Sequence, residues 1–414
     1  PKDTEKLIEV LKNLRDLGNT VIVVEHDEDI MKAADMIIDI GPEAGTHGGE
    51  LVAQGTYDEI LKANSLTAKY LNGDEQIEVP KKRRKFKNHI DIKGARENNL
   101  KNEDFMFPLE CLTVITGVSG SGKSTLVKKI LFPAMQKKLE GVGEKAGQFS
   151  ELSGSFDKIK HIEYVDQNPI GRSSRSNPVT YIKAYDDIRD LFSKQNVSKL
   201  RNYQPKHFSF NVDGGRCETC KGEGEQVVEM QFLADVHLTC EACGGKRFKE
   251  EVLEVNYKDK NIFDVLELSV DQALEFFVED KNIYNAILPL QSVGLGYIKL
   301  GQSSDTLSGG EAQRVKLASF LGKGKGHGQM LFIFDEPTTG LHFHDIKKLL
   351  NSFSALIDQG HSLIVIEHNT DVIKSADWLI DMGPEAGDGG GTVVYEGVPV
   401  GIKKCAASHT AKYM

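Results

Sequence analysis

A glycine-rich segment lies between two runs of contrasting pattern. Residues 112–116 are apolar or β-branched, which is typical of a buried strand, and residues 126–131 have the spacing of a helix. Residues 117–125 read Gly-Val-Ser-Gly-Ser-Gly-Lys-Ser-Thr, which contains the pattern G-x-x-x-x-G-K-S. Strand, loop and helix in this order predict an α/β fold with a phosphate-binding loop (P-loop). The alternative is a chance turn rich in glycine and serine, and the flanking strand and helix argue against it.

The P-loop predicts a nucleoside triphosphate site. Its glycines let backbone N–H groups surround phosphate oxygens, and the helix N-terminus adds a favourable dipole. Lys123 would reach the β- and γ-phosphates, and the Ser124 hydroxyl would ligate Mg²⁺. The predicted ATP-binding residues are Gly117, Val118, Ser119, Gly120, Ser121, Gly122, Lys123, Ser124 and Thr125.

The overall composition is that of a protein with sizeable cores. The chain has 414 residues, enough for two or three domains, of which 39% are hydrophobic and 27% charged. The net charge of −10 argues against a general polyanion binder but leaves room for local basic patches. No long apolar run or signal-peptide pattern is present, which predicts a cytoplasmic protein without a membrane span. Because the chain opens with Pro1, we expect it to be a fragment of a longer protein.

Four of the six cysteines form two C-x-x-C pairs with 19 residues between them: Cys217, Cys220, Cys240 and Cys243. This spacing predicts a tetrahedral Zn²⁺ site of four thiolates. Two disulfides are the alternative, but they need an oxidising compartment. With four protein ligands no position is open for water, so the zinc would be structural. Cys111 and Cys405 are expected to be small core or surface residues.

Two further apolar runs end in residues suited to nucleotide hydrolysis. The run 330–334 leads into Asp335, which would hold Mg²⁺, and Glu336, which would polarise the attacking water. The run 363–366 leads to His368, whose imidazole could contact the γ-phosphate. These residues predict an ATPase.

A glutamine and a second glycine turn complete the pattern. Gln167 ends a predicted strand at 164–167 and would sense Mg²⁺ or water. Residues 307–314 read Leu-Ser-Gly-Gly-Glu-Ala-Gln-Arg, a tight turn that opens a helix and can bind an anion. This order of motifs resembles the ATP-binding cassette superfamily, whose signature motif it contains. The resemblance implies that the signature completes the ATP site of an opposing cassette, through Ser308, Gly309, Gly310 and Glu311.

A long insertion separates the P-loop from the signature. Between Lys123 and Ser308 lie 184 residues, and the four cysteines fall inside this interval. Helical spacing predicts helices at 182–192 and 265–277, and alternation over 226–232 predicts a β-hairpin between the two cysteine pairs.

An internal repeat links the two ends of the chain. Displaced by 342 residues, 23–27 matches 365–369 and 41–45 matches 383–387. We therefore expect residues 1–72 to be the remnant of a first cassette whose P-loop, signature and acidic strand lie outside this sequence. The predicted organisation is a first-cassette remnant at 1–72, a basic linker at 73–88, the first part of the second cassette at 89–170, an inserted region at 171–300 with the zinc module at about 205–250, and the second part of that cassette at 301–414.

The linker contains the most basic run of the chain, Lys-Lys-Arg-Arg-Lys at 81–85. Such a run could contact a nucleic-acid backbone. More often it is a solvated linker, which is the interpretation we favour.

A tandem cassette with this zinc pattern between P-loop and signature resembles the UvrA family, the damage-recognition ATPases of bacterial nucleotide excision repair. The resemblance covers essentially the whole chain and includes residues 94–102, 168–172, 208–216, 293–298 and 335–342. It implies a homodimer that binds damaged double-stranded DNA, loads UvrB and is not itself the nuclease. Because cassette ATP sites are composite, it also implies weak hydrolysis by this chain alone.

The same resemblance implies that the zinc module and its neighbourhood contact DNA. Candidate DNA-binding residues are Arg201, Lys206, Arg216, Lys221, Lys246 and Arg247. The alternative is that Phe208 and Phe210 pack the small core of the module and that the cations are solvated. Lesions share no donor and acceptor code, so recognition would rest on backbone charge and duplex deformability.

Three other functions are alternatives for a chain with these nucleotide-binding motifs. A UvrA-like paralogue in antibiotic or self-resistance would share the fold and the ATPase. The nucleotide-binding subunit of a transporter would have a shorter cassette without a zinc insertion. A chromosome-organising ATPase would need long heptad runs, which are absent from this sequence.

Overall fold

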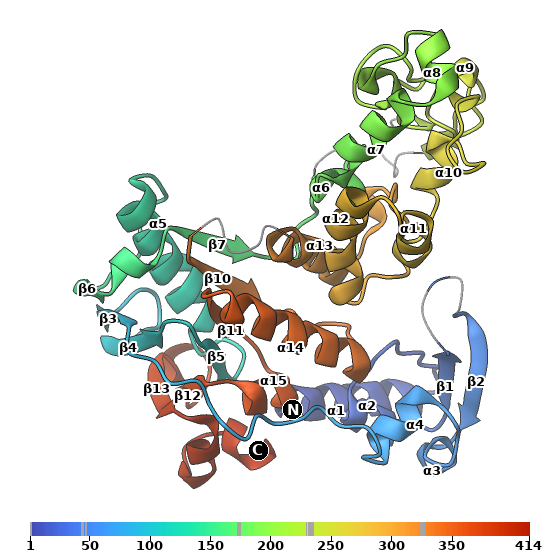
Figure 1. The fold of residues 1–414 in the computed structure, drawn as a ribbon. Helices are drawn as coiled ribbons and strands as arrows, with labels where there is room; N and C mark the ends of the chain where they lie inside the picture. Colours follow the sequence, from blue (N-terminus) through green and yellow to red (C-terminus); the bar gives the residue numbers. More distant parts are fainter. Residues whose placement is uncertain are drawn as a thin grey trace. The chain divides into compact units, whose positions relative to one another are not determined.

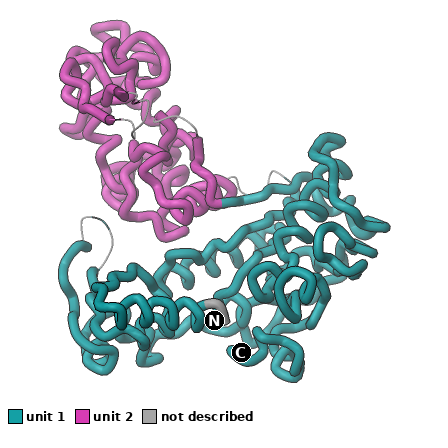
Figure 2. The backbone as a smooth tube through the Cα atoms, turned by 180° about the vertical axis from the view of Figure 1, so that it is seen from behind, with its two compact units in different colours: residues 1–166, 323–414 teal, residues 167–322 magenta. Residues whose placement is uncertain are grey.

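Two compact units make up the chain (Figures 1 and 2). The first comprises residues 1–166 and 323–414, and the second comprises residues 167–322. The computed structural model describes residues 2–42, 45, 48–171, 175–228, 230, 236–322 and 328–414.

A six-stranded sheet forms the centre of the first unit. The strand order is β13-β12-β5-β11-β10-β7, and every neighbouring pair is parallel except β12 with β13. The strands are β5 (Leu112–Gly117), β7 (His161–Val165), β10 (Met330–Asp335), β11 (Ser362–Ile366), β12 (Trp378–Gly383) and β13 (Thr392–Gly397). Every residue of β5 and β11 is buried, as expected of parallel strands covered on both faces. The strands predicted from the apolar runs are confirmed, although β7 ends two residues before Gln167.

A smaller antiparallel sheet packs against the first through one helical segment. Its central strand β3 (His89–Ala95) pairs with β4 (Glu103–Pro108) and β6 (Glu151–Gly154). The helix predicted after the P-loop is a π-helical stretch, η2 (Thr125–Leu131), which continues as α5 (Phe132–Glu140). Buried residues of both sheets and of this segment share one core.

Further helical segments belong to the first unit. They are η3 (Phe156–Lys158), α14 (Phe343–Asp358), α15 (Thr370–Ser375), η7 (Gly387–Gly389), η8 (Pro399–Lys404) and η9 (Thr410–Tyr413). In Figure 1, α14 runs along the sheet beside β10 and β11. No helix in the described part of the chain is both long enough and apolar enough to cross a membrane.

Residues 1–72 repeat part of this architecture. Their elements are α1 (Lys2–Asp16), α2 (Glu28–Ala33), β1 (Ile37–Gly41), β2 (Glu50–Gly55), α3 (Tyr57–Ile60) and α4 (Leu66–Leu71). The register of the β1–β2 pair equals that of β12–β13 at a displacement of 342, and each pair has an irregularity after an aspartate, Asp39 or Asp381. The sequence repeat is therefore also a repeat of strand pairing.

Side-chain contacts follow the same repeat. The Thr67 hydroxyl donates to Asp39 at 3.1 Å, and the Thr410 hydroxyl donates to Asp381 at 3.0 Å. The part that differs is residues 20–24, the counterpart of β11, which form no strand. The matching part of the repeat at 43–44 lies outside the described residues.

The linker does not behave as one solvated segment. The Arg83 guanidinium donates to the Ala376 carbonyl at 2.8 Å, and the Arg84 N–H donates to the Asp377 carboxylate at 2.9 Å. Asp377 also accepts from the N–H of Leu112, at the start of the P-loop strand, at 3.0 Å. The solvated interpretation is thus wrong for these two arginines, because they satisfy polar groups of the cassette. The exposed cations of the linker are Lys81, Lys82, Lys85 and Lys87.

The second unit is mostly helical. Its helical elements are α6 (Pro178–Tyr181), α7 (Ala184–Ser193), α8 (Asn196–Leu200), η4 (Pro205–Phe208), α9 (Glu250–Leu253), α10 (Ile262–Leu266), α11 (Val270–Phe276), α12 (Lys281–Ser292), η5 (Ser304–Thr306) and α13 (Gly309–Leu321). The helix predicted at 182–192 is α7. The single helix predicted at 265–277 is wrong, because Ser269 caps a new helix through the N–H of Gln272 and separates α10 from α11.

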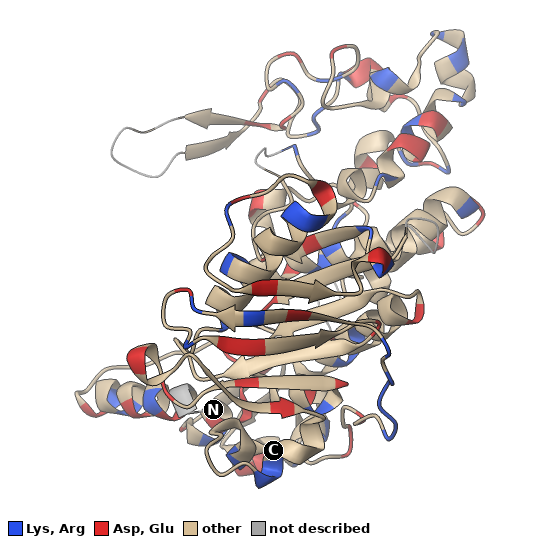
Figure 3. Ribbon diagram, turned by 90° about the vertical axis from the view of Figure 1, so that its left-hand side faces the viewer, with Lys and Arg blue, Asp and Glu red and all other residues tan. Residues whose placement is uncertain are grey.

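The predicted hairpin between the cysteine pairs consists of β8 (Glu225–Val228) and β9 (Val236–Thr239), which pair antiparallel. Of the predicted range 226–232, residues 229 and 231–232 lie outside the described residues. Glu225 is the one Asp, Glu, Lys or Arg residue in these two strands, which Figure 3 draws largely in tan.

Candidate nucleotide site and metal centre

Three neighbouring parallel strands deliver the predicted nucleotide residues of the first unit. The P-loop follows β5, His368 lies two residues beyond β11, and β10 ends with Asp335. Strands β5 and β11 pair with each other, and β11 also pairs with β10. In open α/β sheets ligands bind outside the carboxyl ends of the strands, so the predicted groups gather at the edge where a nucleotide is expected.

Three glycines give the P-loop a backbone path that other residues rarely adopt. Gly117, Gly120 and Gly122 have positive φ values of 133°, 78° and 106°, and a Cβ on Gly117 would lie 2.0 Å from the Met382 carbonyl oxygen. Lys123 is 6% exposed, and its ammonium donates to the carbonyls of Gly117 and Val118 at 3.0 and 2.9 Å. The Lys123 ammonium is therefore held by carbonyls at the start of the loop, and Ser124 at the start of η2 is exposed.

The loop that follows β12 braces the P-loop. The Gly387 N–H donates to the Gly120 carbonyl at 3.1 Å, and the Gly391 N–H donates to the Ser121 carbonyl at 3.0 Å. The Asn99 amide donates to Gly120 at 3.0 Å from the segment between β3 and β4. Segments far apart in the sequence thus fix the loop.

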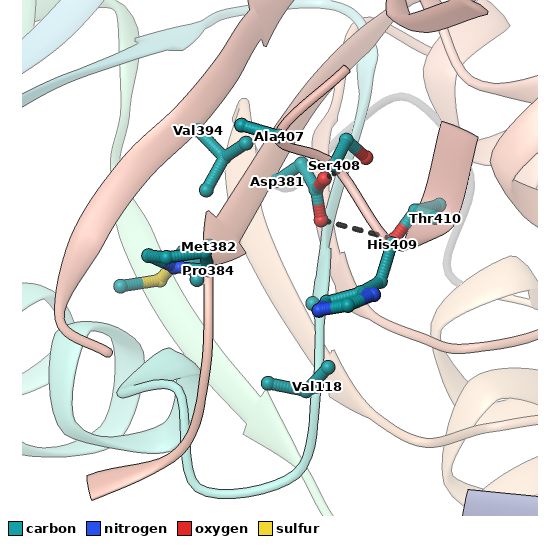
Figure 4. Close-up of a pocket in the computed structure, with 11 residues that line it drawn as sticks. Val118, Asp381, Met382, Pro384, Val394, Ala407, Ser408, His409 and Thr410 are labelled. Atoms are coloured by element: carbon teal, nitrogen blue, oxygen red, sulfur yellow. Dashed lines mark hydrogen bonds between the residues drawn. The ribbon is translucent and has the colours of Figure 1, made fainter. Parts of the chain in front are cut away.

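A small pocket is lined by the start of the P-loop, the end of β12 and residues 407–410 (Figure 4). Asp381 lies in its wall and accepts hydrogen bonds from the hydroxyls of Ser408 and Thr410 at 2.5 and 3.0 Å. Burial raises the pKa of Asp381. The figure shows these side chains gathered on the side of the pocket away from Val118.

Asp335 is held by a tyrosine that the sequence analysis did not single out. The Tyr164 hydroxyl donates to Asp335 Oδ2 at 2.7 Å. Burial and this hydrogen bond raise the pKa of Tyr164, which keeps the phenol a neutral donor. One carboxylate oxygen of Asp335 is therefore directed toward β7.

Glu336 has an unusual backbone conformation. Its φ is 45°, which non-glycine residues adopt only rarely, and its N–H donates to the Ile366 carbonyl at 3.0 Å. Its carboxylate lies 3.8 Å from His368 Nε2, and both side chains are partly exposed. The predicted general base and γ-phosphate histidine are thus adjacent. Glu367, between Ile366 and His368, is 3% exposed, and burial raises the pKa of its carboxyl.

The remaining predicted nucleotide residues belong to the second unit. Ser308 caps α13: its hydroxyl accepts from the Glu311 N–H at 3.3 Å, while the Glu311 carboxylate accepts from the Ser308 N–H at 2.8 Å. Gln167 lies beside this turn, because a Cβ on Gly309 would be 3.0 Å from the Gln167 Cβ. The predicted magnesium ligands Ser124 and Asp335 belong to the first unit.

The four predicted zinc ligands form one cluster. Their sulfur atoms lie within 4.8 Å of one another, with separations of 4.0 Å for Cys217–Cys240 and 3.7 Å for Cys220–Cys243. A tetrahedral zinc with Zn–S bonds of about 2.3 Å requires separations of about 3.8 Å, so the cluster fits this ion. All six cysteines of the chain are free, which excludes the disulfide alternative.

Backbone groups prepare the sulfurs for a cation. The Gly224 N–H donates to Cys220 Sγ at 3.3 Å. Burial opposes ionisation of Cys217, but hydrogen bonds from the N–H groups of Cys220 and Thr219 and from the Cys220 and Cys243 side chains lower its pKa to about 7. Burial raises the pKa of Cys243 to about 12. A bound cation would offset that cost, because zinc ligands are thiolates.

The aromatic residues before the cysteines form a core. Phe208 and Phe210 are both fully buried, and Tyr185 stacks on Phe210 with ring centroids 5.0 Å apart. The alternative in which these phenylalanines pack the module is confirmed.

The candidate DNA-binding cations fall into two groups. Arg201 pairs with Glu254, Arg216 pairs with Asp213, and Arg247 lies over the Phe210 ring at 5.8 Å. Among the described residues, the remaining three form no ion pair and are exposed: Lys206, Lys221 and Lys246.

The chain is similar to curated proteins over its whole length. It is 54% identical over 415 residues to UvrABC system protein A of Clostridium perfringens and 52% identical over 416 residues to that of Mycobacterium bovis. The match covers 100% of this chain but 44% and 43% of those proteins, so the chain spans less than half the length of these relatives. No protein-family model matches the chain.

A solved structure gives the same result. The crystal structure of UvrA2 from Deinococcus radiodurans superposes with a TM-score of 0.93 at 43% identity, covering 100% of this chain and 49% of that one. The P-loop cassette and the four-cysteine cluster agree with this likeness. The chain is therefore a homologue of UvrABC system protein A, with the α/β fold of the ATP-binding cassette ATPases, and it corresponds to a part of those longer proteins.

Proposed function

We propose that this chain binds and hydrolyses ATP as part of a protein that recognises DNA damage in bacterial excision repair. The observation that carries the proposal is the arrangement of β5, β11 and β10, whose neighbouring carboxyl ends bear the P-loop, His368 and the Asp335–Glu336 pair. A lone P-loop would support nucleotide binding only. A carboxylate and an imidazole at the same sheet edge add the groups that hydrolysis needs.

In this proposal each side chain has one role. Lys123 leaves its carbonyl partners to bind the β- and γ-phosphates, and Ser124 and Asp335 hold Mg²⁺. Bound Mg²⁺ supplies positive charge that offsets the charge developing on the phosphates. Glu336 orients and polarises the attacking water, and the neighbouring His368 contacts the γ-phosphate.

The signature residues serve a second nucleotide site. Ser308, Gly309, Gly310 and Glu311 cap α13, whose N-terminus would face the ATP of an opposing cassette. Residues 1–72 would be the end of that first cassette, as their repeat of the β12–β13 pairing supports. We expect the chain to bind ATP and to hydrolyse it slowly unless two copies dock head to tail. Hydrolysis by the dilute chain at the rate of a full-length relative would contradict this.

The proposed nucleic-acid partner is damaged double-stranded DNA, contacted near the zinc cluster. Lys206, Lys221 and Lys246 are the best candidates for phosphate contacts, because they are exposed and need not give up an ion pair. Arg201 and Arg216 would first have to leave their carboxylates. We further propose that the whole protein is a cytoplasmic homodimer and that it loads UvrB.

Two binding assays test the proposal. A gel shift compares damaged with undamaged duplex, with and without ATP, on the wild-type chain and on Cys240→Ser. We expect tighter binding to damaged duplex, and a loss of that preference in the variant. Equal affinity of the wild type for both duplexes would leave only nucleotide binding standing.

A salt titration tests the three lysines. Replacing Lys206, Lys221 and Lys246 by glutamine should reduce the slope of log affinity against log salt by roughly 2–3, since each phosphate contact contributes about 0.9. The matched control replaces three exposed lysines of the first unit, Lys129, Lys137 and Lys145. An equal loss of slope in the control would refute the assignment.

A further inference from the structure

A buried carboxylate joins the two loops that carry the hydrolytic side chains. Glu367 Oε1 accepts from the Thr338 N–H at 2.9 Å and from the Thr338 hydroxyl at 2.5 Å. Glu367 Oε2 accepts from the N–H groups of His368 at 2.7 Å and of Asn369 at 3.0 Å. Four donors thus converge on one side chain that is 3% exposed.

The donors come from two different segments. Thr338 lies in the loop after β10, two residues beyond Glu336, and His368 and Asn369 lie in the loop after β11. We propose that Glu367 is a positioning residue, which holds these loops in register so that Glu336 and His368 face the same phosphate. The 3.8 Å separation between Glu336 and His368 is the geometry that this contact would maintain. The inference rests on the proposed ATPase function.

The chemistry of the side chain requires a carboxylate. Three of the four donors are backbone N–H groups, which cannot act as acceptors, and they are divided between the two oxygens. The amide of glutamine has one oxygen, so an N–H group of one loop would face the NH₂ of the substituted residue. Leaving a buried donor without an acceptor is costly, and the loop that loses its partner has to move.

The internal repeat supplies an independent observation. Glu25, the counterpart of Glu367, accepts from the N–H of His26 at 3.2 Å, so the local half of the contact recurs. Glu25 is exposed, whereas Glu367 is buried beneath the loop that carries Thr338. The local half of the contact does not by itself bury the carboxylate; Glu367 is buried where the loop that carries Thr338 also donates to it.

The test is the isosteric variant Glu367→Gln in the full chain. We expect kcat for ATP to fall about tenfold while KM and the affinity for an ATP analogue stay within twofold, because the P-loop is untouched. Hydrogen exchange should accelerate in the peptides covering 337–341 and 367–370. The control is Glu396→Gln, since Glu396 is a half-buried carboxylate that accepts from Met106 and Trp378 away from these loops. The control should leave kcat unchanged.

A second variant separates positioning from general destabilisation. Thr338→Val removes one donor and should lower kcat two- to threefold. In the double variant of Glu367→Gln and Thr338→Val, the fall in kcat should be smaller than the product of the two single falls. Equal falls in kcat and nucleotide affinity, or unchanged exchange in both peptides, would overturn the inference. If the wild type neither binds nor hydrolyses ATP, the proposed function fails, while the exchange experiment still decides whether Glu367 joins the loops.

Discussion

The internal repeat offers a matched pair of isoleucines for a test of packing. Ile22 and Ile364 occupy the same repeat position, displaced by 342 residues. Ile364 lies in β11 between two parallel strands and is fully buried, whereas Ile22 is 87% exposed and belongs to no strand. Replacing each by alanine removes the same atoms from two environments.

The exposures set the expected magnitudes. Ile364→Ala removes a buried side chain from the main core and leaves a cavity, which should cost about 2–5 kcal/mol of unfolding free energy. Ile22 has most of its surface already in contact with water, so Ile22→Ala should cost less than about 0.5 kcal/mol. At a urea dependence of roughly 2–3 kcal/mol per M, the first variant should lower the unfolding midpoint by about 0.7–2.5 M.

Urea unfolding followed by tryptophan fluorescence measures both variants. Trp378, the one tryptophan of the chain, lies in β12 of the same unit and reports on its core. A midpoint shift for Ile22→Ala as large as that for Ile364→Ala would refute the reasoning, because it would mean that residues 20–24 are packed in solution. A negligible shift for Ile364→Ala would refute the burial argument itself.

Three further predictions concern the site and the fold. Glu336→Gln should keep nucleotide affinity and abolish turnover, because only the water-polarising carboxylate is lost; undiminished phosphate release would contradict its role. Cys240→Ser should reduce bound zinc from about one ion per chain to almost none by elemental analysis, while Cys405→Ser, outside the cluster, should leave it unchanged. Burial lowers the pKa of His361, and its Nδ1 accepts from the Met330 N–H at 3.1 Å, so the folded protein favours the neutral ring. The free energy of unfolding should therefore decrease as the pH falls below about 6.5, where the histidine of the unfolded chain becomes protonated. The urea midpoint should therefore drop between pH 7.5 and 5.5, and by less in His361→Gln, whose amide oxygen can still accept; an identical drop in both proteins would contradict this.

The elements predictable from the sequence are those with local signals. The strands β5, β10 and β11 are continuous apolar runs, and the P-loop and the capped turn at Ser308 are short patterns of fixed spacing. The cysteine cluster is predictable for the same reason. Where a local capping signal was overlooked, at Ser269, the prediction merged two helices into one.

The contacts that orient the site were not predictable in this way. Tyr164 reaches Asp335 across 171 positions in the sequence, and Glu367 reaches Thr338 across 29. A tyrosine in a strand and a glutamate beside a histidine carry no local signal for these contacts. The contacts become predictable only when the pairing of β10 with β7 and β11 is known. The basic linker shows the same limit, because the carbonyl that Arg83 contacts lies 293 positions away.

The repeat separates what neighbouring residues specify from what tertiary packing specifies. The threonine–aspartate hydrogen bond and the irregular register of the hairpin recur in both copies, because each needs only residues within one short segment. The strand does not recur: β11 has two strands beside it, and residues 20–24 lack such neighbours among the described residues. An apolar, β-branched sequence is therefore not sufficient for a strand here, since backbone groups must find partners on adjacent strands. In the same way, Val24 and Ile40 are exposed, whereas their counterparts in the second copy, Ile366 and Met382, are buried in the core around the six-stranded sheet.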